Sequence, residues 1–337
     1  MAAIWLEFLA VALVIAFGGY WVSRFGDAIG DRAGLSGSWV GLVLLATVTS
    51  LPELVSGVTS VTVQHSPDLA VGDVLGSCLF NLLLLAIVDL AYRRNQMYAQ
   101  AASGHVLSLG FAVIMLGLVG LNVLSGTRIG ALPATLDVAT VANIGVYIMA
   151  LRIIFTFERR QLITAPRKPA TAEVPGMSLR VAGAGYVAAA AVVVAAGIWL
   201  PAATVKLANA MGWTSAFAGT LFMAVATSLP ELAVTLAAVR IGALDMAIAA
   251  LLGSNLFNMV VLAVDDIAYD GPLLSDASGV NAITLFSALI ANGLVAAGLI
   301  YRPEGRALHA VSWTSIGLVL VYGLNVWLLA LATAHPG

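Results

Sequence analysis

The hexapeptide Thr-Ser-Leu-Pro-Glu-Leu occurs twice in this chain, at residues 49–54 and again at 227–232. Both copies lie within long apolar stretches, so each places a glutamate where a membrane-spanning helix normally carries no charge. A second phrase follows each copy, Gly-Ser-Cys-Leu-Phe-Asn at 76–81 and Gly-Ser-Asn-Leu-Phe-Asn at 253–258. The chain therefore contains an internal repeat, and any fold prediction has to start from it.

The repeat covers residues 41–92 in the first copy and 219–269 in the second. The second copy follows the first by 178 residues up to the glutamates and by 177 residues after them. One residue was therefore gained or lost in the connection between the two phrases. Matched positions outside the phrases include Asp89 and Asp266.

Composition predicts an integral membrane protein. The 337 residues are 61% hydrophobic and only 9% charged, with a mean hydropathy of +1.01, whereas soluble domains carry about a quarter charged residues. The single cysteine, Cys78, excludes an internal disulfide framework. The apolar N-terminus lacks a basic region before it, so we expect a retained first span and no cleaved signal peptide.

A helix needs about 20 apolar residues to cross a bilayer, and ten segments qualify. A polar linker at 158–178 divides them into two halves, 1–157 and 179–337, with five spans each. The predicted fold is thus all-α, with ten transmembrane helices. The expected spans are 3–23, 37–63, 68–91, 103–123, 137–157, 179–200, 213–239, 244–268, 281–300 and 309–333.

Basic residues predict the orientation, because Lys and Arg concentrate in cytoplasmic loops. With the linker in the cytoplasm, 13 of the 15 basic residues fall inside, and only Arg128 and Lys206 fall outside. Both termini are then extracytoplasmic, and we expect the plasma (inner) membrane as the location. Five spans per half also give the two repeats opposite orientations, as in many secondary transporters with a midplane site.

The two glutamates, Glu53 and Glu231, need a partner, because an ionised carboxylate at the bilayer centre costs several kcal/mol. Their spans contain no lysine or arginine near them, so the remaining partners are a bound cation or a proton. Proline removes a backbone donor and disturbs the preceding helical turn. We therefore expect free carbonyls around Ala46 and Ala224, facing a cavity.

The polar residues of both phrases form an all-oxygen set. Thr49 and Glu53 share a helix face, and so do Ser77 and Asn81, because each pair is four residues apart. Oxygen ligands suit hard cations such as calcium, sodium or magnesium, and the histidine and cysteine set preferred by zinc is missing from the phrases. The open alternative for each hydroxyl or amide is a hydrogen bond between helices. The candidates are Thr49, Ser50, Glu53, Ser77, Asn81, Thr227, Ser228, Glu231, Ser254 and Asn258.

The paired phrases resemble the two alpha-repeats of the calcium/cation antiporter superfamily, which includes the sodium/calcium exchangers. The resemblance implies that these ten residues bind the cation, together with the backbone carbonyls of Ala46 and Ala224. It also implies antiport, either electrogenic or proton-coupled. In such a mechanism the first and sixth spans slide across a fixed core.

The chain departs from the family pattern at several positions. Val48 and Ala226 replace the usual glycine, and Cys78 replaces an asparagine. Many sodium/calcium exchangers carry an aspartate in one repeat where this chain has Asn81 and Asn258. Fewer fixed charges weaken the case for three bound sodium ions and leave proton coupling open.

Asp73 offers a third carboxylate. It lies four residues before Ser77 and eight before Asn81, within about 80° of the same helix face. We expect it near the site or along its access path; the alternative is a residue near the helix end that reaches water. Asp89, Asp265 and Asp266 close two spans and are expected at the membrane interface.

The leading interpretation is a secondary antiporter that exchanges calcium for sodium, and the alternative is a divalent cation/proton antiporter of the same fold. An ion channel is disfavoured because inverted repeats around one charged site favour alternating access. An enzyme is disfavoured because no nucleophile has an adjacent base, and an ATP-driven pump because no Gly-rich phosphate loop is present. We expect no cofactor. The expected partners are small cations and the lipid bilayer, without nucleic acid. The oligomeric state is left open, with a monomer as one possibility.

Overall fold

A computed structural model describes residues 1–32, 45–92, 96–125, 136–164, 178–302 and 311–334. Their regular elements are helices, as predicted. In chain order these are α1 (Ala2–Arg32), α3 (Ala46–Thr49), α4 (Leu51–Thr62), α5 (Pro67–Ala91), α6 (Met97–Gln100), α7 (His105–Ser125), α8 (Val138–Thr164), α9 (Leu179–Met211), α10 (Ser215–Ala218), the π-helical turn η2 (Gly219–Met223), α11 (Ala224–Thr227), α12 (Leu229–Arg240), α13 (Leu244–Ala268), α14 (Leu273–Asp276), α15 (Asn281–Tyr301) and α16 (Trp313–Ala334).

Eight of the described helices are long and apolar enough to cross a membrane. A ninth candidate is the pair formed by Ser215–Thr227 and Leu229–Arg240, which is bent by 42° at the break. The expected second span, 37–63, lies partly outside the described residues, and so does most of the polar linker. Ten spans in two inverted halves therefore stay a prediction.

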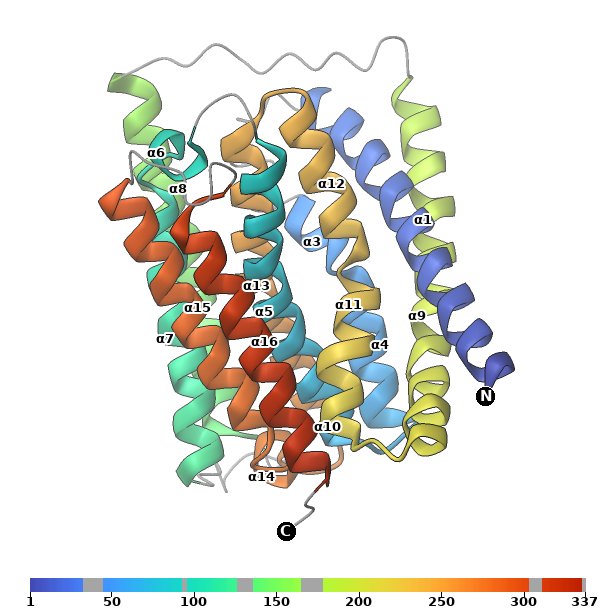
Figure 1. Ribbon diagram of the computed structural model, residues 1–337. Coiled ribbons are helices and arrows are strands. Elements are labelled where there is room, and N and C mark those ends of the chain that lie inside the picture. Colours follow the sequence, from blue (N-terminus) through green and yellow to red (C-terminus); the bar gives the residue numbers. More distant parts are fainter. Residues whose placement is uncertain (33–44, 93–95, 126–135, 165–177, 303–310, 335–337) are drawn as a thin grey trace.

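The helices run up and down through one bundle (Figure 1). α4 descends into the lower part of the bundle in this view, whereas α12 ascends into the upper part, so the two repeated hexapeptides begin helices of opposite direction. The start of α1 and the end of α16 lie at the same end of the bundle, which is the end with the termini. α1 and α9 stand together along one side, apart from the cluster formed by α5, α7, α8, α13, α15 and α16.

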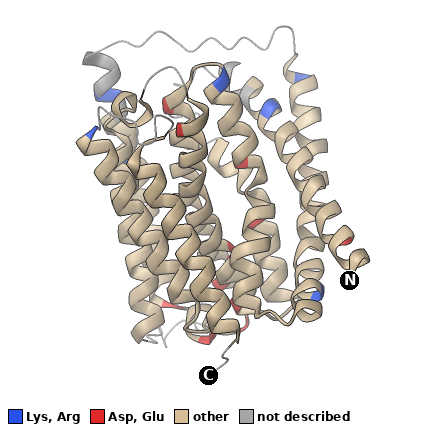
Figure 2. Ribbon diagram, in the orientation of Figure 1, with Lys and Arg blue, Asp and Glu red and all other residues tan. Residues whose placement is uncertain are grey.

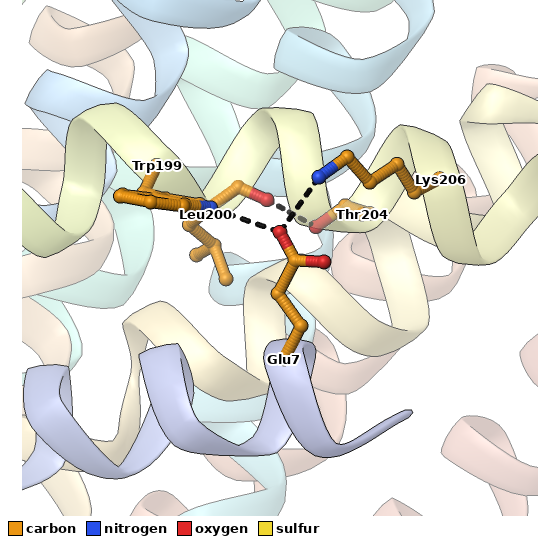
Figure 3. A network of polar contacts seen from close by, with 5 residues as sticks. All are labelled: Glu7, Trp199, Leu200, Thr204 and Lys206. Carbon is orange, nitrogen blue, oxygen red and sulfur yellow. Dashed lines mark hydrogen bonds and ion pairs between the residues drawn. The ribbon is translucent and has the colours of Figure 1, made fainter. Parts of the chain in front are cut away.

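Small residues allow α1 and α9 to pack closely. A Cβ built on Gly185 of α9 would lie 2.4 Å from the Phe25 ring, and one on Gly18 of α1 would lie 2.8 Å from Val193. At the other end of the pair, the carboxylate of Glu7 accepts hydrogen bonds from Lys206 Nζ at 2.7 Å and Trp199 Nε1 at 3.0 Å (Figure 3). These contacts make α1 and α9 one two-helix unit.

Two aspartates join each half to the start of a helix from the other half. Asp89, near the end of α5, accepts hydrogen bonds from Ser312 N and Ser315 Oγ, both at 2.7 Å, at the start of α16. Its repeat equivalent Asp266, near the end of α13, accepts from Asp137 N at 3.1 Å and from Thr140 Oγ1, at the start of α8. Negative charge at a helix N-terminus is stabilising.

The opposite ends of α5 and α13 repeat this arrangement. Asp68 accepts from Ser278 N and Asn281 Nδ2, both at 2.7 Å, at the start of α15. Its equivalent Asp245 accepts from Ala102 N at 2.7 Å, just before α7. Each central helix is therefore fixed at both ends to two helices of the other half.

Asp89, Asp265 and Asp266 are buried within the bundle, with exposed fractions of 1%, 0% and 1%. Each lies within three residues of the end of its helix, and their expected depth at the membrane interface stays a prediction. Asp89 and Asp266 are buried because each caps a helix of the opposite half, a contact between residues more than 120 positions apart. Helical spacing within one span carries no information about such a partner.

Charge is distributed unevenly along the bundle (Figure 2). Most Lys and Arg gather at the end where α8 finishes and α9 begins, whereas Asp and Glu lie at both ends and in the interior. The described residues thus have one basic end.

We predict that Asp89→Ala lowers the thermal unfolding midpoint, because the substitution leaves the buried Ser312 amide without its acceptor. The loss of hydrogen bonds to a charged group costs about 1.5–3 kcal/mol each. Purified protein in detergent is heated, and the monodisperse fraction is measured by size-exclusion chromatography. Asp270→Ala, at an exposed position, is the matched control; equal midpoints for the two variants would contradict the capping role.

Candidate functional site

The two hexapeptides fold in the same way. Ser50 interrupts the helix between α3 and α4 with φ −86° and ψ 12°, and Ser228 interrupts it between α11 and α12 with φ −86° and ψ 7°. Pro52 and Pro230 lie in the first turn of the helix that follows, where a missing N–H needs no partner. Each glutamate therefore lies in the first turn of a new helix, deep inside the bundle.

The carbonyls of Ala46 and Ala224 are not free. Ala46 O accepts the amide of Ser50 at 3.1 Å, and Ala224 O accepts the amide of Ser228 at 3.1 Å. The donor that a proline lacks belongs to the carbonyl four residues earlier, at Val48 or Ala226. The expectation that proline frees the two alanine carbonyls is therefore wrong. A carbonyl oxygen has two lone pairs, however, and each of these two carbonyls also lies beside a threonine of the site.

The glutamates are held by serines from both halves. Glu53 Oε1 accepts from Ser77 Oγ at 3.4 Å and from Ser228 Oγ at 3.1 Å. In the mirrored arrangement, Glu231 Oε1 accepts from Ser254 Oγ at 3.3 Å and from Ser50 Oγ at 3.2 Å. Each carboxylate thus binds one serine of its own half and one of the opposite half.

The threonines close the same network. Thr49 Oγ1 lies 3.4 Å from Ser254 Oγ, and Thr227 Oγ1 lies 3.4 Å from Ser77 Oγ. Eight of the ten polar candidates, all of them except the two asparagines, are therefore brought together by contacts that follow the repeat. All eight side chains are buried.

Four buried oxygen acceptors of this region have no hydrogen-bond partner among the described residues. They are Glu53 Oε2, Glu231 Oε2, Asn81 Oδ1 and Asn258 Oδ1. A buried polar atom left unpaired costs about 1–3 kcal/mol, and a charged one costs more. Hard cations bind carboxylate and amide oxygens, so the unpaired atoms are of the kind that such an ion would satisfy. Within the described ranges, no three His, Cys, Asp or Glu side chains gather as a metal site.

Asp73 joins the network through a hydroxyl. Its Oδ1 accepts from Thr227 Oγ1 at 3.1 Å, and its Oδ2 accepts from Ser56 Oγ at 2.8 Å. The side chain is fully buried, so the alternative of a residue that reaches water is wrong. The structure brings Asp73 to the edge of the site, where Thr227 and then Ser77 connect it to Glu53.

Sequence reasoning missed Asn255. Its Oδ1 accepts from Asn81 Nδ2 at 3.1 Å, and its Nδ2 donates to the carbonyl of Cys78 at 3.0 Å. Asn255 and Cys78 occupy equivalent positions of the repeat, and they meet where α5 and α13 cross. The one difference between the two Gly-Ser phrases was the signal that could have found this contact.

Two glycines let α5 approach the broken helix of the second half. A Cβ on Gly76 would lie 2.5 Å from Thr220 O, and one on Gly219 would lie 2.7 Å from Leu69 O. Residues 219–223 form a π-helical turn. Such turns are rare in proteins overall, and many of those known lie at functional sites. This close contact brings Ser77 within reach of Thr227.

Comparison with known proteins identifies the family. Residues 3–158 and 181–331 match the family model described as sodium/calcium exchanger protein. The chain belongs to this family. The resemblance read from the two repeats is thereby confirmed, and the family is one of transporters.

Relatives and solved structures agree with this assignment. The chain is 24% identical over 318 residues to the inner membrane protein YrbG of Escherichia coli, covering 88% of this chain and 87% of that protein. A structure of the sodium-calcium exchanger NCX_Mj, soaked with 2.5 mM Na+ and 10 mM Sr2+, has a TM-score of 0.62 at 20% identity, covering 96% of this chain and 98% of that one. The structure of native YfkE has a TM-score of 0.63 at 17% identity, covering 96% and 91%. The likeness to the two structures shows a shared fold.

We predict that Gly76→Ala disrupts the site, because the added methyl would push α5 away from the backbone of Thr220. Overpacking of this kind costs about 1–3 kcal/mol. The measurement is the thermal unfolding midpoint together with ion transport in proteoliposomes. Gly145→Ala is the control, since a Cβ there meets nothing within 4 Å. If Gly76→Ala behaved like this control, the close approach of α5 to Thr220 would not be needed for the site.

Proposed function

We propose that this exchanger-family protein is a secondary active antiporter that moves calcium against sodium at one central site. The observation that carries the proposal is the unpaired, buried carboxylate oxygen on each of the two glutamates, one from each half. An intramembrane carboxylate without a basic partner is a functional-site hypothesis by default. A cation shared by the two halves would supply the missing partner for both.

Calcium fits this oxygen set best by charge. Two ionised glutamates balance one divalent ion, and calcium takes six to eight oxygen ligands in flexible geometry. In this proposal Glu53 and Glu231 supply the charge, and neutral oxygens complete the shell. The proposed neutral ligands are Thr49, Ser50, Ser77, Asn81, Thr227, Ser228, Ser254, Asn258 and the carbonyls of Ala46 and Ala224.

Alternating access would follow from the crossed hydrogen bonds. Ser228 donates to Glu53 and Ser50 donates to Glu231, so any relative movement of α4 and α12 changes the surroundings of both carboxylates together. The opposite directions of α4 and α12 favour two inverted halves of five spans each. The paired helices α1 and α9 lie against these broken helices, where a sliding unit could open the site to one side at a time.

The coupling ion is sodium in this proposal, and proton is the alternative. Asn81 and Asn258 add no charge to the site, which limits the number of sodium ions that it could neutralise. With protons, the glutamates would cycle between protonated and calcium-bound forms. The two alternatives differ in whether a sodium gradient drives calcium flux.

Orientation follows from the uneven distribution of charge. The basic end of the bundle carries the ends of α8 and α9 that flank the 158–178 linker, so we place that end in the cytoplasm of a cell with this protein in its plasma (inner) membrane. Both termini are then extracytoplasmic. The proposed site uses residues of a single chain, so a monomer would be sufficient.

We predict sodium-driven 45Ca2+ uptake into proteoliposomes loaded with sodium, at equal pH on both sides. Glu53→Gln and Glu231→Gln should each reduce the uptake at least about tenfold, since a buried charge that loses its partner costs roughly 3–5 kcal/mol. A second set of vesicles carries a pH gradient and no sodium. Asp270→Asn, at an exposed position outside the site, is the matched control.

Uptake driven only by the pH gradient would replace sodium by proton as the coupling ion. Full uptake by both glutamine variants would contradict the central site. Absence of uptake by the folded wild-type protein under either gradient would contradict calcium as the substrate.

A further inference from the structure

We propose that Asp73 and Asp265 form a second cation site, on the route between the central site and the end of the bundle that carries the termini. This inference rests on the proposed function, because its ligand is the cation in transit. Nothing in the repeated phrases points to Asp265, which comes from α13 of the second half.

The two carboxylates lie against neighbouring residues of α4. Asp73 Oδ2 accepts from Ser56 Oγ at 2.8 Å. A Cβ built on Gly57 would lie 2.4 Å and 2.6 Å from the two carboxylate oxygens of Asp265. Consecutive Cα atoms are about 3.8 Å apart, so α4 receives one carboxylate from α5 and one from α13 on adjacent residues.

Asp265 has no partner that explains its burial. Its exposed fraction is 0%, and neither of its oxygens has a hydrogen-bond partner within the described parts of the chain. Protonation of one oxygen would not repair this, because the new hydroxyl would have no acceptor and the other oxygen would still have no donor. A bound cation satisfies both oxygens together, and intramembrane acids commonly mark ion pathways.

The surrounding charges do not neutralise the pair. The acid that α4 itself contributes is Glu53. The Asp266 carboxylate, next to Asp265 on α13, already accepts hydrogen bonds from Asp137 N, Thr140 Oγ1 and Leu273 N. Neither Asp73 nor Asp265 forms an ion pair with a lysine or arginine of the described residues. Two carboxylates would balance one divalent ion or two monovalent ions.

The other half shows that the fold does not need these acids. The repeat equivalents of Asp73, Ser56 and Asp265 are Ala250, Val234 and Val88. These three side chains are buried, with exposed fractions of 4%, 6% and 1%. The same structural position is thus packed with apolar residues on one side of the repeat and carries an acidic pair on the other.

The pair lies between the central site and one end of the bundle. Asp265 is three residues before the end of α13, about 5 Å along the helix, and Asp73 is six residues after the start of α5, about 9 Å. Thr227 Oγ1 connects it to the centre, since it lies 3.1 Å from Asp73 Oδ1 and 3.4 Å from Ser77 Oγ. A cation leaving the glutamates toward this end would meet the pair next.

The test is the number of 45Ca2+ ions bound per chain, measured by equilibrium dialysis of the full-length protein in nanodiscs without sodium. We expect two ions for the wild type and one for Asp265→Asn. Asp265→Val copies the apolar equivalent Val88, which keeps the packing, and should also bind one. Glu231→Gln should lose the central ion and retain the other, whereas the control Asp270→Asn should keep both.

A parallel measurement with 22Na+ distinguishes a divalent from a monovalent cation at the second site. One calcium and one sodium ion per wild-type chain, with only the sodium lost in Asp265→Asn, would support the second site with a monovalent ligand. An identical number of ions in wild type and in both Asp265 variants would overturn the second site while leaving the central site intact. No bound ion in the folded wild type would overturn the proposed function as well.

Discussion

Two carboxylates buried at the centre of an apolar bundle form the constraint on which the rest of this structure depends. Glu53 and Glu231 would repel one another, and burial removes the water that would screen them. One oxygen of each carboxylate accepts a hydrogen bond from the serine at the helix break of the opposite half: Ser228 donates to Glu53, and Ser50 donates to Glu231. The second oxygen of each remains open. A site that is satisfied only when an ion is present is suited to transport, because release leaves it poised to bind again.

The core of the molecule is held together by contacts that each half makes with the other. α5 packs with α15 and α16, whereas α13 packs with α7 and α8. Aspartates at both ends of α5 and α13 hold these partners by their N-termini. The helices α1 and α9 take no part in this exchange and pack on one another. The architecture therefore separates a cross-linked core from a two-helix unit, with the broken helices between them.

Much of the site could be predicted from one sequence because the repeat shows it twice. Two copies of Thr-Ser-Leu-Pro-Glu predicted a disturbed helix near each glutamate and the family, and eight of the ten polar candidates lie in one hydrogen-bonded network. The unpredicted features depend on contacts between the halves. Asp265 and Asp266 are adjacent in sequence, yet one caps a helix and the other has no partner, a difference that no spacing rule could reveal. The alanine carbonyls were misjudged because proline affects the carbonyl four residues earlier.

The exchanged caps have a consequence for how the chain matures. α7 and α8 leave the ribosome well before Asp245 and Asp266 have been synthesised, so the residues before both helices lack their acceptors at that stage. The first half would thus enter the bilayer as a set of loosely associated helices. Its native packing would form only when α13 arrives, and the last two helices would in turn be held by Asp68 and Asp89, already in place. Neither half is a finished module, and the ancestral single repeat would have needed a second copy of itself to complete these contacts.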